Sequence, residues 1–173
     1  EAYIEFAGEP SAVELLDRYP NLVVLRTLSK ALAFAGARCG AVMGPVDFIR
    51  ILNAIQAPYA MSTPVVECVE DALQSAALDE ASGRIAEVVA ERERLMAGMS
   101  SFAFVDTAWP SAANFFLIRV ADSEAVIQDA RNRGILLRDF GGSLPGCIRI
   151  TVGSRSENDR LLALFADIEG GEA

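Results

Sequence analysis

The stretch from Asn21 to Gly40, NLVVLRTLSKALAFAGARCG, constrains the fold more than any other part of the chain. Its first part, Leu22 to Leu25, is a short continuous apolar run with two β-branched valines, which is typical of a buried strand in a parallel sheet. A polar segment follows this run directly. Because ligands of open α/β sheets bind beyond the carboxyl ends of the strands, we expect a binding site in the residues after Leu25.

Lys30 lies in this polar segment. It is the only lysine among the fifteen basic side chains of the chain, and all the others are arginines. A guanidinium stays protonated at any working pH, whereas a lysine amine can lose its proton and form an imine with an aldehyde. A solvated surface lysine is the alternative interpretation, and composition alone weighs the two evenly.

Residue types that bind phosphate surround Lys30 in the sequence. Arg26, Thr27 and Ser29 precede it, and Arg38 follows eight residues later. Hydroxyl groups and a guanidinium beside a lysine are what a phosphate monoester with a neighbouring aldehyde requires. This combination describes pyridoxal 5′-phosphate.

A second candidate site lies near the C-terminus, in the predicted strand Cys147 to Val152. Alternation places Ile148, Ile150 and Val152 on one face, and it places Arg149 on the opposite face. The planar fork of Arg149 suits a bidentate interaction with a substrate carboxylate. A solvent-exposed arginine is the alternative that the strand alone would favour.

Four motifs in order carry a resemblance to a known family: EAYIEF at 1–6, RTLSKALAFAGARCG at 26–40, APYAMS at 57–62 and CIRITVG at 147–153. They resemble the histidinol-phosphate aminotransferase family of fold-type I pyridoxal-phosphate enzymes, nearly end to end. The family's first motif reads Asp-Glu-Ala-Tyr, and this chain begins at that Glu, so the Asp that pairs with the pyridinium nitrogen is absent. We therefore expect roughly the C-terminal half of a longer enzyme.

The resemblance implies a role for each matching residue around the cofactor. Lys30 would hold pyridoxal 5′-phosphate covalently and then act as the general base on the substrate. Tyr3 would contact the phenolic oxygen of the cofactor. Ser29 and Arg38 would bind its phosphate, with Thr27 as a further candidate.

The resemblance also implies the substrates. Arg149 would bind the α-carboxylate of the amino acid, and Arg138 would meet the distal phosphate or side-chain carboxylate. The amino donor would be histidinol phosphate and the 2-oxo acid 2-oxoglutarate, in a cytoplasmic homodimer of histidine biosynthesis. Alternatives are an aromatic amino-acid aminotransferase, a related decarboxylase, or a non-catalytic fragment that needs the missing N-terminal half or a partner.

The expected fold class is α/β, in two parts. Residues 1–78 would form the C-terminal part of the large cofactor-binding domain of a fold-type I transferase, and residues 79–173 a small α+β domain. The predicted helices are a short one from the capping box at Ser11, 46–56, 64–100 with a break at Gly83, 123–133, and a last one from the capping box at Ser154. The predicted strands are 22–26, 39–43, 102–106, 115–120, 135–139 and 147–152.

Charge and composition exclude several other functions. A net charge of −9 with dispersed arginines argues against nucleic-acid binding, and no apolar run approaches the length of a membrane span. The chain has no histidine, so we expect no zinc site and no metal. Cys39, Cys68 and Cys147 are interpreted as small buried residues in a reducing cytoplasm.

Overall fold

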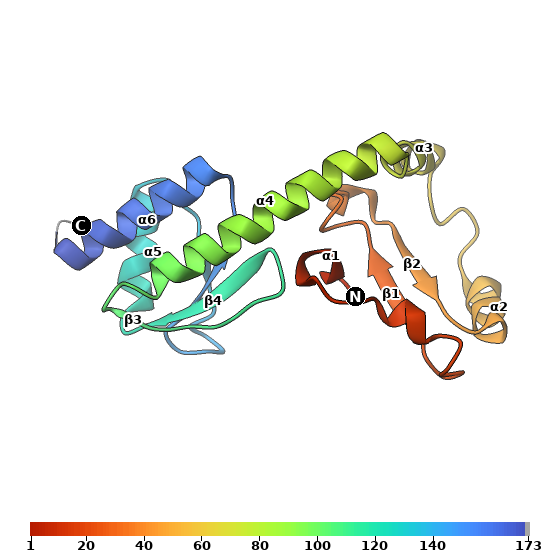
Figure 1. The fold of residues 1–173 in the computed structure, drawn as a ribbon, viewed down its shortest axis with the longest axis horizontal. Coiled ribbons are helices and arrows are strands. Elements are labelled where there is room, and N and C mark those ends of the chain that lie inside the picture. Colours follow the sequence, from red (N-terminus) through yellow and green to blue (C-terminus); the bar gives the residue numbers. More distant parts are fainter. Residues whose placement is uncertain (172–173) are drawn as a thin grey trace. The chain divides into compact units, whose positions relative to one another are not determined.

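The computed structural model describes residues 1–171 and divides the chain into two compact units, Glu1–Ile85 and Ala86–Ala173 (Figure 1). The helix α4, Ser75–Met99, contributes residues to both units. The boundary between the two compact units therefore lies within this helix, between residues 85 and 86. The division into domains at 78/79 stays a prediction. Each unit has its own sheet.

The sheet of the first unit is a two-stranded antiparallel ribbon. Strand β1, Val24–Thr27, pairs with β2, Gly40–Met43, so that Val24 lies opposite Met43 and Thr27 opposite Gly40. The expected parallel pairing of this strand is therefore wrong for the described residues. The physical reason lies in the connection, which contains only the 3₁₀ helix η2, Ala35–Ala37, and not the α-helix that usually carries a parallel crossover.

Burial in this ribbon does not run continuously along the strands. Val24 is buried, whereas Leu25 is 61% exposed, so the prediction of a fully buried apolar run was wrong. Gly40 has a steric role in the pairing, because a Cβ atom there would lie 2.6 Å from the carbonyl oxygen of Arg26. Only glycine lets the two strands approach so closely at this point.

The N-terminal segment of the first unit contains two short helices, α1 at Ile4–Ala7 and η1 at Ala12–Leu15. The short helix predicted from the capping box at Ser11 is present as a 3₁₀ helix, and the Ser11 hydroxyl accepts from the Val13 N–H (3.1 Å). The carboxylate of Glu1 accepts from the Ser11 hydroxyl (2.9 Å) and the Ala12 N–H (2.6 Å). A distant carboxylate thus binds the helix start, which local sequence does not reveal.

Helix α2, Val46–Ile55, confirms the prediction of a helix at 46–56. Helix α3 spans Thr63–Ala72, and Leu73 is its C-cap. The Gln74 side chain, just beyond the cap, donates to the Glu70 carbonyl of the helix (3.1 Å). The break therefore precedes α4, and the prediction of a break at Gly83 was wrong. An added Cβ at Gly83 would meet no atom within 4 Å, and the helix continues through this exposed position.

Helix α2 leaves apolar side chains in solvent. Ile51 is 61% exposed and Ile55 is 75% exposed, and Val46 and Phe48 of the same helix are exposed as well. A surface of this kind favours association with other apolar surfaces.

We predict that the chain of residues 1–173 self-associates through α2, because burial of these side chains removes apolar area from water. The double variant Ile51→Glu, Ile55→Lys should lower the concentration dependence of its sedimentation coefficient, with unchanged circular dichroism. Asn53→Lys, at an exposed polar position of the same helix, is the matched control. Association that persists in the double variant would contradict the prediction.

The second unit contains a four-stranded antiparallel sheet in the order β3-β4-β6-β5. Its strands are β3 at Val105–Ala108, β4 at Phe115–Val120, β5 at Arg138–Asp139 and β6 at Cys147–Thr151. Its helices are the last part of α4, α5 at Ser123–Asn132 and α6 at Arg155–Gly170. This arrangement confirms the predicted α+β character of the C-terminal part.

One hydrophobic core joins the sheet and the three helices of this unit. Its fully buried residues are Leu95, Met99, Ile118, Ala130, Ile148, Ile150, Leu164 and Phe165. Phe102 and Phe104 pack with their rings 5.7 Å and 5.3 Å from that of Phe165. Both residues precede β3, which begins at Val105, and this corrects the predicted strand at 102–106.

Two further predictions need correction. The predicted strand 135–139 is reduced to Arg138–Asp139, which pair with β6. Of the three cysteines, Cys147 is buried and Cys39 is half-buried, but Cys68 is exposed. Cys68 lies on α3, where the described residues do not cover it.

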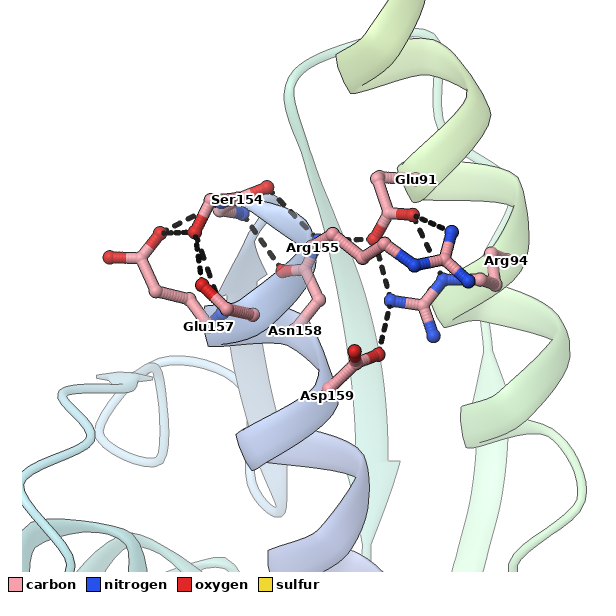
Figure 2. A network of polar contacts seen from close by, with 9 residues as sticks. Glu91, Arg94, Ser154, Arg155, Glu157, Asn158 and Asp159 are labelled. Atoms are coloured by element: carbon pink, nitrogen blue, oxygen red, sulfur yellow. Dashed lines mark hydrogen bonds and ion pairs between the residues drawn. The ribbon is translucent and has the colours of Figure 1, made fainter.

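A polar network joins α4 to the start of α6 (Figure 2). The Glu91 carboxylate accepts from Arg94 (2.6 Å) and from the Asn158 amide (2.8 Å), and it forms an ion pair with Arg155 (3.3 Å). These interactions, the Arg94 hydrogen bond above all, lower the pKa of Glu91 to about 2. Asn158 is only 2% exposed, so the network holds its buried amide in one orientation.

The turn after β6 is bound by the same asparagine. The Asn158 side chain accepts from the Gly153 N–H (3.0 Å) and donates to the Gly153 carbonyl (3.0 Å). The predicted capping box is confirmed, since Ser154 and Glu157 bond each other's backbone N–H groups. A Cβ at Gly153 would lie 2.8 Å from the Glu157 carboxylate, so the glycine makes room for this cap.

We predict that Glu91 makes the second unit sensitive to acid. Its pKa falls from 4.5 to about 2 on folding, so its contribution to the free energy of unfolding is present above about 4.5 and is lost as the pH falls towards 2. Glu91→Gln should lower the free energy of unfolding at pH 7 by about 1–3 kcal/mol and flatten this acid dependence.

Urea unfolding monitored by the fluorescence of Trp109, the single tryptophan, would measure this effect at several pH values. Glu87→Gln, at an exposed position of the same helix, is the control and should leave the profile unchanged. An unchanged acid dependence in Glu91→Gln would show that the network does not contribute in this way.

Candidate functional site

The loop between β1 and β2 brings three of the predicted site residues to one end of the ribbon. The Leu28 N–H donates to the Cys39 carbonyl (3.2 Å), which extends the pairing one residue beyond Thr27 and Gly40. Ser29 and Arg38 are the next residues on each side of this extended ladder. The Phe34 N–H then donates to the Leu28 carbonyl (3.0 Å), so that the loop carrying Lys30 folds back onto the ribbon.

Lys30 is exposed at this end of the ribbon, and its Nζ lies 5.6 Å from the centroid of the Tyr3 ring. Among residues 1–171, no carboxylate forms an ion pair with Lys30. The surroundings of Lys30 therefore leave its amine accessible to an electrophile.

The backbone is constrained at the loop residues that carry the hydroxyl and guanidinium groups. Thr27 Oγ1 accepts from the Ser29 N–H (3.1 Å), a local turn that fixes the chain immediately before Lys30. Arg38 adopts a left-handed conformation with φ of 54° and donates from Nη1 to the Ala35 carbonyl (3.0 Å). A non-glycine residue in this region is uncommon and often marks a functional constraint.

These donors match the groups that pyridoxal 5′-phosphate presents. The cofactor has an aldehyde for an amine, a phosphate for hydroxyl and guanidinium donors, and a phenolic oxygen for a hydroxyl partner. Lys30, Ser29, Arg38 and Tyr3 supply such groups within one compact unit. The residues present therefore fit the cofactor.

The second set of predicted residues lies on the sheet of the C-terminal unit. Arg138 of β5 is the direct cross-strand partner of Arg149 of β6, so both lie on the same face of the sheet. Like charges placed opposite each other are unfavourable unless an anion lies between them. The pair is therefore suited to an anionic ligand.

The alternation predicted for β6 is confirmed. Ile148, Ile150 and Val152 are buried in the core, and Arg149 lies on the other face. The Nε of Arg149 is buried and has no hydrogen-bond partner among residues 1–171. Its guanidinium carbon lies 5.1 Å from the centroid of the Phe115 ring.

Two residues near this site were missed by sequence reasoning. Phe115 had been placed only in a strand, although alternation with the buried Phe116 puts it on the face of Arg149. Arg92 of α4 is 6% exposed and donates from Nη1 to the Ala113 carbonyl (3.0 Å). Its position three residues before Leu95, on the apolar stripe of the helix, was the available signal.

Residues 1–171 contain no group of three or more metal-ligating side chains. Within the same residues, no helix combines the length and the apolar character that crossing a membrane requires.

The chain is similar to known aminotransferases. The family model described as aminotransferase class I and II matches residues 1–165. The histidinol-phosphate aminotransferase of Xylella fastidiosa (strain 9a5c) is 46% identical over 171 residues, which are 98% of this chain and 47% of that protein. That of Stenotrophomonas maltophilia is 44% identical over 168 residues, which are 96% of this chain and 46% of that protein. The chain thus spans about half the length of the curated relatives it matches.

The fold agrees with solved structures of such enzymes. The histidinol-phosphate aminotransferase of Sinorhizobium meliloti in complex with pyridoxal-5′-phosphate superposes with a TM-score of 0.83 at 26% identity. The match covers 100% of this chain and 48% of that chain. This confirms the predicted fold class, because the matched part is the C-terminal half of a fold-type I aminotransferase. By the family model and by the fold, this chain belongs to the pyridoxal-phosphate-dependent class I and II aminotransferase family.

Proposed function

We propose that the chain forms part of a histidinol-phosphate aminotransferase, which transfers an amino group from histidinol phosphate to 2-oxoglutarate in histidine biosynthesis. The observation that carries this proposal is the 46% identity to the Xylella enzyme, which extends over 98% of the chain. The accessible Lys30 and the arginine pair of β5 and β6 supply the two kinds of group that the reaction needs.

Lys30 is the proposed catalytic residue. When bound, pyridoxal 5′-phosphate supplies an electron sink for the bond that breaks at the substrate carbon. Nζ of Lys30 would hold the cofactor covalently, and the same side-chain amine, once free, would take up the proton from the substrate carbon.

The remaining residues of the loop would bind and orient the cofactor. Ser29 and Arg38 would donate to its phosphate, and Thr27 would support them through its hydrogen bond to the Ser29 N–H. The Tyr3 hydroxyl would contact the phenolic oxygen of the cofactor, from a ring that already lies beside Lys30.

The two arginines of the sheet would bind the substrates. Glutamate and 2-oxoglutarate carry two carboxylates, whereas histidinol phosphate carries a phosphate and no carboxylate. Arg149 would bind the α-carboxylate, and Arg138 would bind the distal phosphate or carboxylate. The direct cross-strand pairing of the two residues supports a shared role in anion binding.

We also infer a cytoplasmic homodimer. The resemblance to the family implies both features, and the apolar side chains that α2 exposes are consistent with burial in a larger assembly. Sedimentation of a full-length aminotransferase containing this sequence would test the dimer.

We predict that Lys30→Arg abolishes covalent cofactor binding and turnover in such a full-length enzyme, because arginine keeps the charge but cannot form the imine. Borohydride reduction followed by peptide mass spectrometry would show the cofactor on the peptide of Lys30 in the parent and on no peptide in the variant. Circular dichroism controls for folding. Recovery of the adduct on a different lysine would refute the assignment.

We predict that Arg149→Ala weakens the glutamate half-reaction more than the histidinol-phosphate half-reaction. Loss of a desolvated charge-assisted pair costs about 2–5 kcal/mol, which is roughly thirty-fold or more in rate. Arg138→Ala should weaken both half-reactions, since both substrates carry a distal anion.

Single-turnover measurements of each half-reaction would test this division of roles. Equal losses for both substrates in Arg149→Ala would contradict it. Turnover of aromatic amino acids but not of histidinol phosphate by the parent enzyme would instead identify an aromatic amino-acid aminotransferase.

A further inference from the structure

The buried guanidinium of Arg92 has no part in the function proposed above. It is 6% exposed, and it donates to the Ala113 carbonyl (3.0 Å) and to the Glu93 carboxylate (3.1 and 3.2 Å). A charge in such a place is costly unless its donors are satisfied, and its removal leaves its partners unpaired. Arg92 therefore fixes the position of the backbone at Ala113.

Ala113 belongs to the turn that leads into β4. Its N–H donates to Ser111 Oγ (3.1 Å), and the Ser111 hydroxyl donates to the Phe115 carbonyl. The Asn114 carbonyl accepts from the Val152 N–H (3.0 Å), which joins the turn to the end of β6. These bonds hold the backbone on both sides of Phe115 and thereby fix the position from which its side chain extends.

The ring of Phe115 lies beside the guanidinium of Arg149, 5.1 Å from its carbon to the ring centroid. Leu117 is the cross-strand partner of Arg149, and Phe115 lies two residues before Leu117 on β4. The side chains of Phe115 and Arg149 therefore lie on the same face of the sheet. The negative face of an aromatic ring attracts a cation at this distance. Among residues 1–171, neither a hydrogen bond to Nε nor an ion pair holds Arg149.

We propose that Phe115 is a positioning residue that orients the Arg149 guanidinium for the substrate carboxylate, and that Arg92 keeps Phe115 in place through the turn at Ala113. The inference rests on the proposed function, in which Arg149 binds a carboxylate. A bidentate interaction requires both the position and the plane of the fork, so an arginine without its ring partner loses affinity for the carboxylate. Histidinol phosphate has no carboxylate and provides an internal reference.

The experiment compares Phe115→Leu, Phe115→Tyr and Arg92→Lys in a full-length aminotransferase containing this sequence. Calorimetry with glutarate, a dicarboxylate that does not react, reports carboxylate binding without turnover. Single-turnover rates report the glutamate and histidinol-phosphate half-reactions separately. Circular dichroism and thermal unfolding report folding.

Phe115→Leu should weaken glutarate binding and the glutamate half-reaction by about ten-fold, or ~1.4 kcal/mol, and change the histidinol-phosphate half-reaction by less than about two-fold. Phe115→Tyr keeps the ring face and should behave like the parent. Arg92→Lys keeps the charge but not the fork, so it should show the same selective loss to a smaller extent, about three-fold.

Trp109→Leu is the matched control. It removes another pair of ring and guanidinium in the same unit, in which Arg119 lies 5.2 Å from the Trp109 ring. This variant should show no selective loss of glutarate binding. A selective loss as large as that of Phe115→Leu would overturn the inference.

Equal losses in both half-reactions, or unchanged glutarate affinity in Phe115→Leu, would also overturn it. If Phe115→Leu does not fold, Arg92→Lys decides the question by the presence or absence of the selective loss. A parent that binds glutarate but does not convert histidinol phosphate would refute the proposed function alone, and the glutarate measurements would still decide the inference. A parent that does not bind glutarate would overturn the inference itself.

Discussion

The register of β6 between β4 and β5 determines both the core of the C-terminal unit and the position of its two facing arginines. Ile148 pairs with Ile118 and lies in the core, whereas Arg149, one residue later, pairs with Leu117 and Arg138 on the other face. A slip of one residue would bury the arginine and expose the isoleucine. Hydrophobic burial therefore places the guanidinium, and the same free energy that folds the sheet selects the position of the Arg149 side chain.

The first unit depends on backbone pairing to a greater degree. Among its described residues, the buried apolar side chains are only Phe6, Val24, Ala31 and Ala81. The loop of Lys30 is shaped by the ladder of β1 and β2, by its extension at Leu28, and by the close approach that Gly40 permits. Such a unit gains little from hydrophobic burial by itself, so the geometry around Lys30 depends on these backbone hydrogen bonds.

Sequence predicted the features that local periodicity determines. The face of Arg149 and the capping box at Ser154 follow from a strand period of two and from side chains three residues apart, and both are confirmed. Features that depend on distant residues were missed or wrong. The antiparallel pairing of β1 depends on a partner strand beyond the Lys30 loop. The contacts of Arg92 and Phe115 depend on tertiary structure. Arg92 of α4 donates to the turn before β4, and Phe115 of β4 lies beside Arg149 of β6.

The facing arginines of β5 and β6 make the stability of the sheet edge sensitive to anions. Strand β5 has only two residues, and one of them places its charge directly opposite Arg149. Repulsion between the two guanidinium groups weakens this pairing when no anion is present, and a bound anion replaces it with attraction to both. An anionic ligand that binds the folded edge must stabilise it by linkage. The free energy of repulsion between the two arginines, which a bound anion removes, therefore adds to the affinity for that anion.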